Sequence, residues 1–159
     1  MNHKKTASDK DQPWALVTGA SAGIGAEFCR QLAAKGYQLV LVARREDKLQ
    51  AVADELRESF DANSIIITAD LSRQGACEEI VNRLENEDIT IEYLVNNAGY
   101  GLPGSYHVPS WQKHADFIQV MMTSVCELTR RLLPGMRERG RGYIVNLASV
   151  AGLVAPSAG

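Results

Sequence analysis

The sequence of 159 residues lacks any hydrophobic run that approaches the length of a membrane span, and its first dozen residues have no apolar core. A membrane helix needs about 20 apolar residues, and a signal peptide needs an apolar segment of about 7 to 15, so neither is expected. There is also no excess of basic residues, because the formal net charge is −2. Without a basic field, nothing points to nucleic acid or membrane as a partner. We therefore expect a cytoplasmic protein whose partners must be inferred from its sites.

Residues that could form a disulfide framework or a metal centre are few. The three cysteines, Cys29, Cys77 and Cys126, are an odd number, widely spaced, and each falls within a predicted helix. That pattern fits neither a disulfide framework nor a zinc site. His107 and His114 lack a cluster of cysteines or carboxylates that would complete a metal site. No metal site is predicted, and the thiols are interpreted as structural or incidental.

A glycine-spaced turn near the N-terminus is the most informative stretch. It runs from Val17 to Ala26 (VTGASAGIGA), after a short apolar run and before a segment of helical periodicity that ends near Gly36. Glycines allow close approaches that a Cβ would block, so pyrophosphate oxygens could reach main-chain N–H groups at the helix start. The pattern predicts a phosphate-binding turn, and a glycine-rich loop without a ligand is the alternative. The candidate residues in the turn are Gly19, Ser21, Gly23, Ile24 and Gly25.

The order of the predicted elements indicates the fold class. A hydrophobic content of 45% suits one domain with a real core, expected over residues 13–159 after a disordered polar tail at 1–12. Apolar runs of strand length alternate with segments of helical periodicity, which predicts parallel strands joined by right-handed crossovers. The fold is therefore expected to be α/β, a doubly wound Rossmann-like sheet. The predicted strands are Trp14 to Val17, Gln38 to Ala43, Ser64 to Thr68, Ile91 to Val95 and Tyr143 to Leu147.

Two helical segments carry specific expectations about their ends. Ser72 is a plausible N-cap for the helix whose apolar face includes Ala76. A longer helical region is expected from about Ser110 to Arg139, in two pieces, with Pro134 kinking it or shortening its last turn.

Three motifs in order carry a family resemblance. The spacing TGxxxGxG, the tetrapeptide from Asn96 to Gly99 (NNAG) and the tetrapeptide from Asn146 to Ser149 (NLAS) together resemble the short-chain dehydrogenase/reductase family, in its N-terminal cofactor-binding part. The resemblance implies a sheet truncated here after its fifth strand. It also implies an oxidoreductase that moves hydride between a nicotinamide cofactor and a small-molecule carbonyl or alcohol, and a homo-oligomer when the chain is full length.

The cofactor residues implied by this resemblance follow the second, third and fourth strands. Arg44 follows the second strand, where a cation would meet the 2′-phosphate of NADP, so NADP (NADPH) is the expected cofactor. The alternative is that Arg44 and Arg45 only start a solvated helix. Asp70 and Leu71 match positions that flank the adenine ring, although Asp70 could also be a plain loop cap. The segment expected beside the adenosine is Asn97, Ala98 and Gly99.

The catalytic residues implied by the resemblance are incomplete. Ser149 matches the serine that hydrogen-bonds the substrate carbonyl, but the chain reaches Gly159 before the family's tyrosine and lysine would occur. Met121 stands where the family has an asparagine that helps to hold a water chain, unless Thr123 or Ser124 takes that role. The alternative function is therefore a non-catalytic dinucleotide-binding module.

Overall fold

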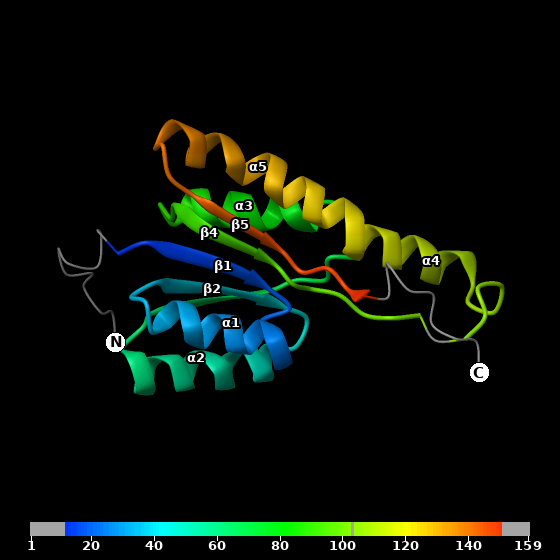
Figure 1. Cartoon of the computed structure of the whole chain (residues 1–159), viewed down its shortest axis with the longest axis horizontal. Coiled ribbons are helices and arrows are strands. Elements are labelled where there is room, and N and C mark those ends of the chain that lie inside the picture. Colours follow the sequence, from blue (N-terminus) through cyan, green and yellow to red (C-terminus); the bar gives the residue numbers. More distant parts are fainter. Residues whose placement is uncertain (1–11, 103, 151–159) are drawn as a thin grey trace.

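Five parallel strands form one sheet in the computed structural model, which describes residues 12–102 and 104–150. The strand order is β3-β2-β1-β4-β5, so successive strands run outward from β1 in one direction and then restart on its other side at β4. This arrangement confirms the predicted doubly wound α/β fold, which ends here with the fifth strand (Figure 1). The strands are β1 (Trp14–Thr18), β2 (Gln38–Ala43), β3 (Ser64–Thr68), β4 (Ile91–Asn96) and β5 (Tyr143–Asn146).

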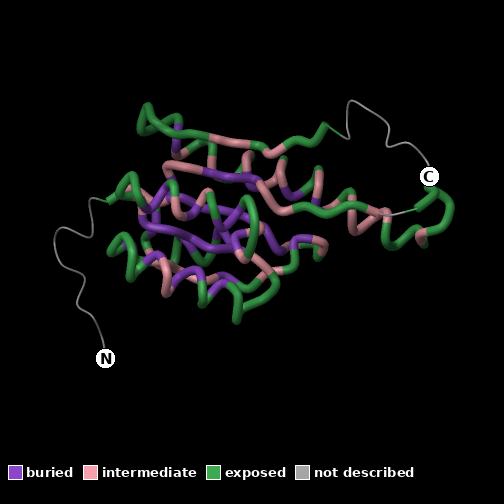
Figure 2. The backbone as a smooth tube through the Cα atoms, turned by 60° about the horizontal axis from the view of Figure 1, so that its bottom comes forward, coloured by how far each residue is buried: buried purple, intermediate pink, exposed green. Residues whose placement is uncertain are grey.

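Helices cover both faces of the sheet. On one face lie α1 (Gly23–Ala33) and α2 (Glu46–Phe60), and on the other lie α3 (Ala76–Asn86) and α5 (Ser124–Glu138) (Figure 1). Because alternate side chains of a strand point to opposite faces, Leu16 belongs to the core under α3 and α5, whereas Val17 belongs to the core under α1 and α2. Burial on both sides explains the nearly continuous apolar run of β2. Figure 2 shows the buried backbone concentrated in these central strands.

The long helical region before β5 is interrupted earlier than its proline suggests. It consists of α4 (Trp111–Ile118), a π-helical turn η2 (Gln119–Thr123) and α5. The helix α5 continues past Pro134 to Glu138, close to the predicted end of the region near Arg139, and a kink at this proline stays a prediction. Pro134 forfeits its own N–H, but the helix still packs through Leu128 and Met136, both buried.

The prediction that Ser72 caps α3 is wrong. The helix begins at Ala76 after Gly75, which has a φ of 82°. Instead, both the backbone N–H and the hydroxyl of Ser72 donate to Asp70 Oδ1, at 3.0 and 2.8 Å. This local turn satisfies the serine before the helix starts. Asp70 therefore does act as a loop cap.

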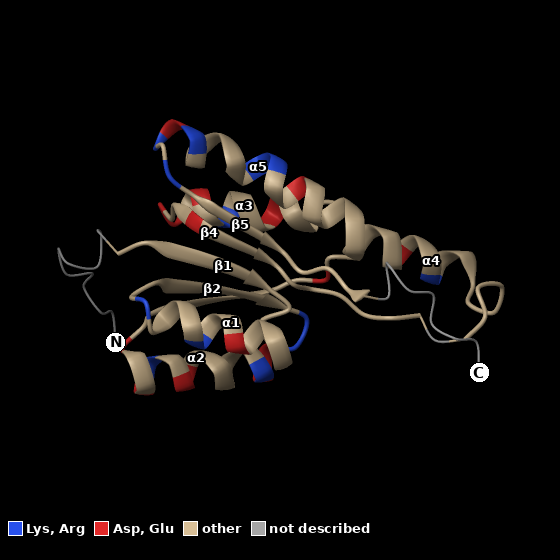
Figure 3. Ribbon diagram, in the orientation of Figure 1, with Lys and Arg blue, Asp and Glu red and all other residues tan. Residues whose placement is uncertain are grey.

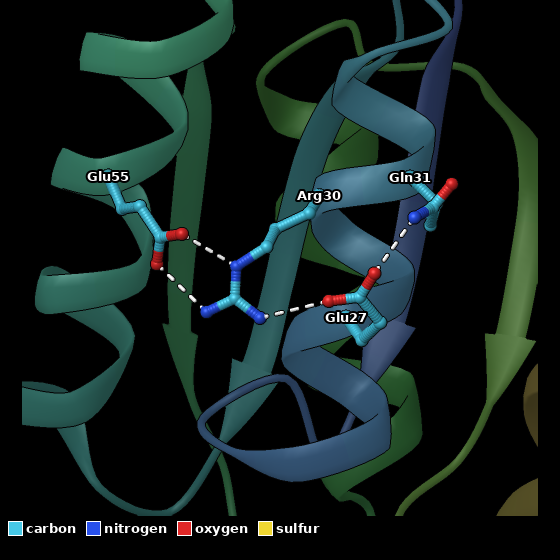
Figure 4. A network of polar contacts seen from close by, with 4 residues as sticks. All are labelled: Glu27, Arg30, Gln31 and Glu55. Atoms are coloured by element: carbon cyan, nitrogen blue, oxygen red, sulfur yellow. Dashed lines mark hydrogen bonds and ion pairs between the residues drawn. The ribbon is translucent and has the colours of Figure 1, made fainter.

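Charged side chains lie mainly on the outer faces of the helices, and the described strands carry few of them (Figure 3). One cluster ties α1 to α2. The guanidinium of Arg30 donates to both carboxylate oxygens of Glu55, at 2.6 and 2.9 Å, and to Glu27, which Gln31 also contacts (Figure 4). These hydrogen bonds lower the pKa of Glu55 and of Glu27. Since the side chains are more than one-third exposed, the pair contributes at most about 1 kcal/mol.

Candidate cofactor site

A cleft of about 410 Å³ opens where the strands end. Its walls come from residues after β1, β2, β3 and β4, together with side chains from α4 and η2. Successive strands leave β1 and β4 in opposite directions, so a crevice forms between them at the carboxyl edge of the sheet. In open α/β sheets this is where ligands bind. The residues that line the cleft are Gly19, Ser21, Ala22, Val42, Ala43, Arg44, Arg45, Ala69, Asp70, Leu71, Ser72, Ala98, Gly99, Tyr100, Asp116 and Val120.

The glycine turn after β1 is closed more tightly than any residue with a Cβ would allow. Gly19 has a φ of 67°, and a Cβ at Gly25 would lie 2.2 Å from the Gly19 carbonyl oxygen and 2.5 Å from Asn97 Nδ2. The first turn of α1 therefore sits directly against the end of β1. This is the cradle that a pyrophosphate needs, with main-chain N–H groups of a helix start brought close to the cleft.

A hydrogen-bond network fixes the turn to the end of β4. The side-chain amide of Asn97 donates to the carbonyl of Thr18 at 2.9 Å and of Gly19 at 3.3 Å. The buried hydroxyl of Thr18 accepts from the backbone N–H groups of Asn97 and Ala98, both at 3.0 Å, and donates to the carbonyl of Val95 at 3.3 Å. The two strands that flank the crevice are thus connected at its floor.

The structure brings most of the predicted cofactor residues together. Seven of them line the cleft: Gly19, Ser21, Arg44, Asp70, Leu71, Ala98 and Gly99. The other four lie behind it or beside it. Gly25 and Asn97 form the closure described above, Gly23 opens α1, and the Ile24 side chain is 63% exposed.

Ser149 lies apart from this cleft. It follows β5 by three residues, is exposed, and is not among the described residues that line the cleft. Since β5 is next to β4 in the sheet, Ser149 is nevertheless on the same carboxyl edge as the cleft. The predicted tail at 1–12 lies outside the described residues except for Gln12, whose side-chain oxygen accepts from Gln38.

Cations and carboxylates both face the cleft. Arg44 and Arg45 are exposed at the end of β2, and Arg45 donates to the hydroxyl of Ser21 at 3.3 Å. The pKa of Asp70 is lowered, first by its hydrogen bond from the Ser72 backbone and less by Arg44 and Arg73. Asp70 is therefore held as an anion beside the arginines. The cleft can receive a ligand that carries anionic groups on one part and donors on another.

Met121 cannot supply the amide that the family resemblance implies at its position. Its sulfur lies against Gly99, where it would be 2.9 Å from an added Cβ. The hydroxyl of Ser124 is buried and donates to the carbonyl of Val120 at 2.8 Å, and Thr123 is exposed. The thioether therefore packs against Gly99, which lines the cleft.

Sequence reasoning missed several residues of the cleft wall, among them Tyr100, Asp116 and Val120. Asp116 and Val120 are four residues apart, a spacing that places both on one face of a helix. That spacing was visible in the sequence, but only the position of α4 beside the segment after β4, where Phe117 contacts Tyr100, identifies the face as a wall of the cleft. Within residues 12–102 and 104–150, no helix is long and apolar enough to cross a membrane, and no group of three potential metal ligands gathers.

Comparisons with known proteins agree with this geometry. A sequence model of the family described as short chain dehydrogenase matches residues 13–159. A very-long-chain 3-oxoacyl-CoA reductase from Anas platyrhynchos is 40% identical, with 88% of this chain and 46% of the relative covered. A second, very-long-chain 3-oxoacyl-CoA reductase-A from Danio rerio, is 36% identical, with 92% and 46% covered. The chain thus spans somewhat less than half the length of these curated relatives.

Solved structures are similar over most of the chain. A short-chain dehydrogenase from Sphingobium yanoikuyae in complex with NADPH superposes with a TM-score of 0.84 at 36% identity, covering 91% of this chain and 56% of that one. An L-sorbose reductase from Gluconobacter frateurii, complexed with NADPH and L-sorbose, gives 0.83 at 30% identity, covering 89% and 54%.

Proposed function

Because the chain belongs to the short-chain dehydrogenase family, we propose that it forms the NADP-binding part of a reductase that moves hydride between the nicotinamide and a carbonyl or alcohol. The cofactor would supply the hydride chemistry, and the protein would bind and orient it. The observation that carries the proposal is the cleft after β1, in which the glycine turn, Arg44, Asp70 and Leu71 meet.

Each wall of the cleft would have its own part in holding the dinucleotide. The glycine turn would present backbone N–H groups to the pyrophosphate, and Leu71 and Ala98 would offer apolar contact to the adenosine. Arg44 and Arg45 favour NADP over NAD, because a guanidinium is well matched to a 2′-phosphate. Two solved relatives that contain NADPH support the same choice.

Ser149, at the same edge of the sheet as the cleft, suggests the class of substrate, a carbonyl compound. Ser149 would hydrogen-bond the carbonyl oxygen of the substrate and so polarise it. The names of the curated relatives make a 3-oxoacyl thioester the first carbonyl compound to test.

A binding module without turnover is the second candidate function. It rests on a specific observation: none of the five tyrosines in the 159 residues stands four positions before a lysine. The family's proton donor and its activating lysine have that spacing, so neither Tyr106 nor Tyr143 can simply replace the donor.

The test is a titration of NADPH and NADH against the wild type and Arg44→Asp. An exposed charge-assisted hydrogen bond is worth about 1.5 kcal/mol, so we expect roughly tenfold weaker NADPH binding and little change for NADH. The exposed Arg130 of α5, which does not line the cleft, provides a control of equal charge as Arg130→Asp. Equal losses for both cofactors would reject the role of Arg44.

A further inference from the structure

Asp116 is a cleft residue that the family motifs do not include. It lies in α4, four residues before Val120 of η2, and the two side chains line the same wall of the cleft. Val120 is buried and Asp116 is partly buried. The carboxylate therefore occupies the rim of the wall whose inner part is apolar.

The side chain of Asp116 has a hydrogen-bond partner within α4. Gln112, one turn earlier in α4, donates from Nε2 to Asp116 Oδ1 at 2.7 Å. A carboxylate has about four lone-pair sites, so this hydrogen bond leaves acceptor capacity for a ligand. The neighbouring Phe117 packs edge-on against Tyr100, with ring centroids 5.5 Å apart, which brings Tyr100 to the same rim.

Electrostatics place the Asp116 charge beside the cleft. Burial raises the pKa of Tyr100, and the charge of Asp116 raises it further, whereas Arg44 lowers it. A fixed carboxylate would repel the phosphates of a dinucleotide unless it faces a hydrogen-bond donor of that ligand. Arg44 and Arg45 supply the cationic part of the cleft, and Asp116 supplies an anionic group on its α4 wall that a donor group of a ligand could face.

Asp70 is engaged in a different way. Its Oδ1 accepts both the N–H and the hydroxyl of Ser72, so its orientation is set by the turn after β3. Two carboxylates from different elements, one in the β3 loop and one in α4, thus face one cleft.

We infer that Asp116 is a specificity-determining residue that accepts a hydrogen bond from the 6-amino group of the cofactor's purine, so that the cleft selects a 6-amino over a 6-oxo purine. The inference rests on the proposed function, because it requires a dinucleotide in this cleft. A 6-oxo group is an acceptor and would face the Asp116 carboxylate unfavourably. In the variant Asp116→Asn, the amide could donate to that oxygen instead.

The experiment measures calorimetric binding of NADP and of its hypoxanthine analogue, deamino-NADP, to the full chain. We expect the wild type to bind NADP at least about fivefold more tightly than deamino-NADP, since a hydrogen bond to a charged group is lost. For Asp116→Asn the ratio should fall to about one, chiefly through tighter binding of the analogue. Thermal melts confirm that each variant is folded.

A matched control is Asp54→Asn, which removes the same charge from the outer face of α2, where Asp54 pairs with Arg57 outside the cleft. Its ratio should remain that of the wild type. An unchanged ratio in Asp116→Asn overturns the inference, and so does a ratio that is lost only in Asp70→Asn. Failure of the wild type to bind either dinucleotide would instead overturn the proposed function.

Discussion

Replacing Gly25 with alanine should destabilise the protein and weaken dinucleotide binding together. The new Cβ would lie 2.2 Å from the Gly19 carbonyl oxygen and 2.5 Å from Asn97 Nδ2, far inside van der Waals contact. Because one obstacle is backbone, we assign the upper end of overpacking costs, about 3 kcal/mol. Alanine regains about 1 kcal/mol of helix propensity in α1, which leaves about 2 kcal/mol. For a chain of this size, the melting temperature should fall by about 4 to 8 °C.

The assay is a thermal melt followed by circular dichroism, with an NADPH titration of the same samples. Gly101→Ala is the matched control, because no atom lies within 4 Å of its added Cβ and its φ is outside the left-handed region. We expect the control to melt within about 2 °C of the wild type, since surface substitutions cost little. If Gly25→Ala melts like the control and binds NADPH equally well, the close approach of α1 to β1 is not what shapes the turn.

Three further predictions concern catalysis, association and pH. The 159 residues alone should show no turnover of a carbonyl substrate with NADPH, and activity that disappears in Ser149→Ala would show that another donor acts. The isolated chain should self-associate in light scattering, because β5 carries no charge and, within the described residues, pairs only with β4; a monodisperse monomer would contradict this. Asp70 has a lowered folded pKa, so its stabilising contribution is complete above its unfolded pKa of about 3.9 and is lost as pH falls through the folded pKa. In acid melts, Asp70→Asn should show less of this loss than the wild type does.

The sheet could be predicted because its signals are local. Runs such as Gln38 to Ala43 are apolar enough for burial on both faces, and the glycine turn identified the order of strand and helix. The ends of helices were less predictable where a candidate capping side chain makes other hydrogen bonds. Ser72 resembles an N-cap, but its N–H and hydroxyl donate to Asp70 in a local turn, and the helix starts only at Ala76, after Gly75.

The parts of the site that the sequence did not reveal depend on how strands pair. Asn96 donates to Asn146 Oδ1 at 2.9 Å because β4 and β5 place the two residues opposite each other. Thr18 meets Asn97 for the same kind of reason, across 79 positions of sequence. No local sequence pattern predicts which residues of neighbouring strands lie opposite each other. The compartment, the oligomeric state and the N-terminal tail stay predictions.

The hydroxyl of Thr18 determines how much of the crevice must be ordered when a ligand arrives. It satisfies two backbone N–H groups after β4 and one carbonyl within it, so both sides of the crevice are already held at a fixed separation. Immobilising loops and side chains is one of the main entropic costs of binding, and a preorganised site avoids part of it. A ligand at this floor would therefore meet a rigid base, and the remaining adjustment would fall on the exposed rim, where Arg44, Arg45 and Tyr100 lie.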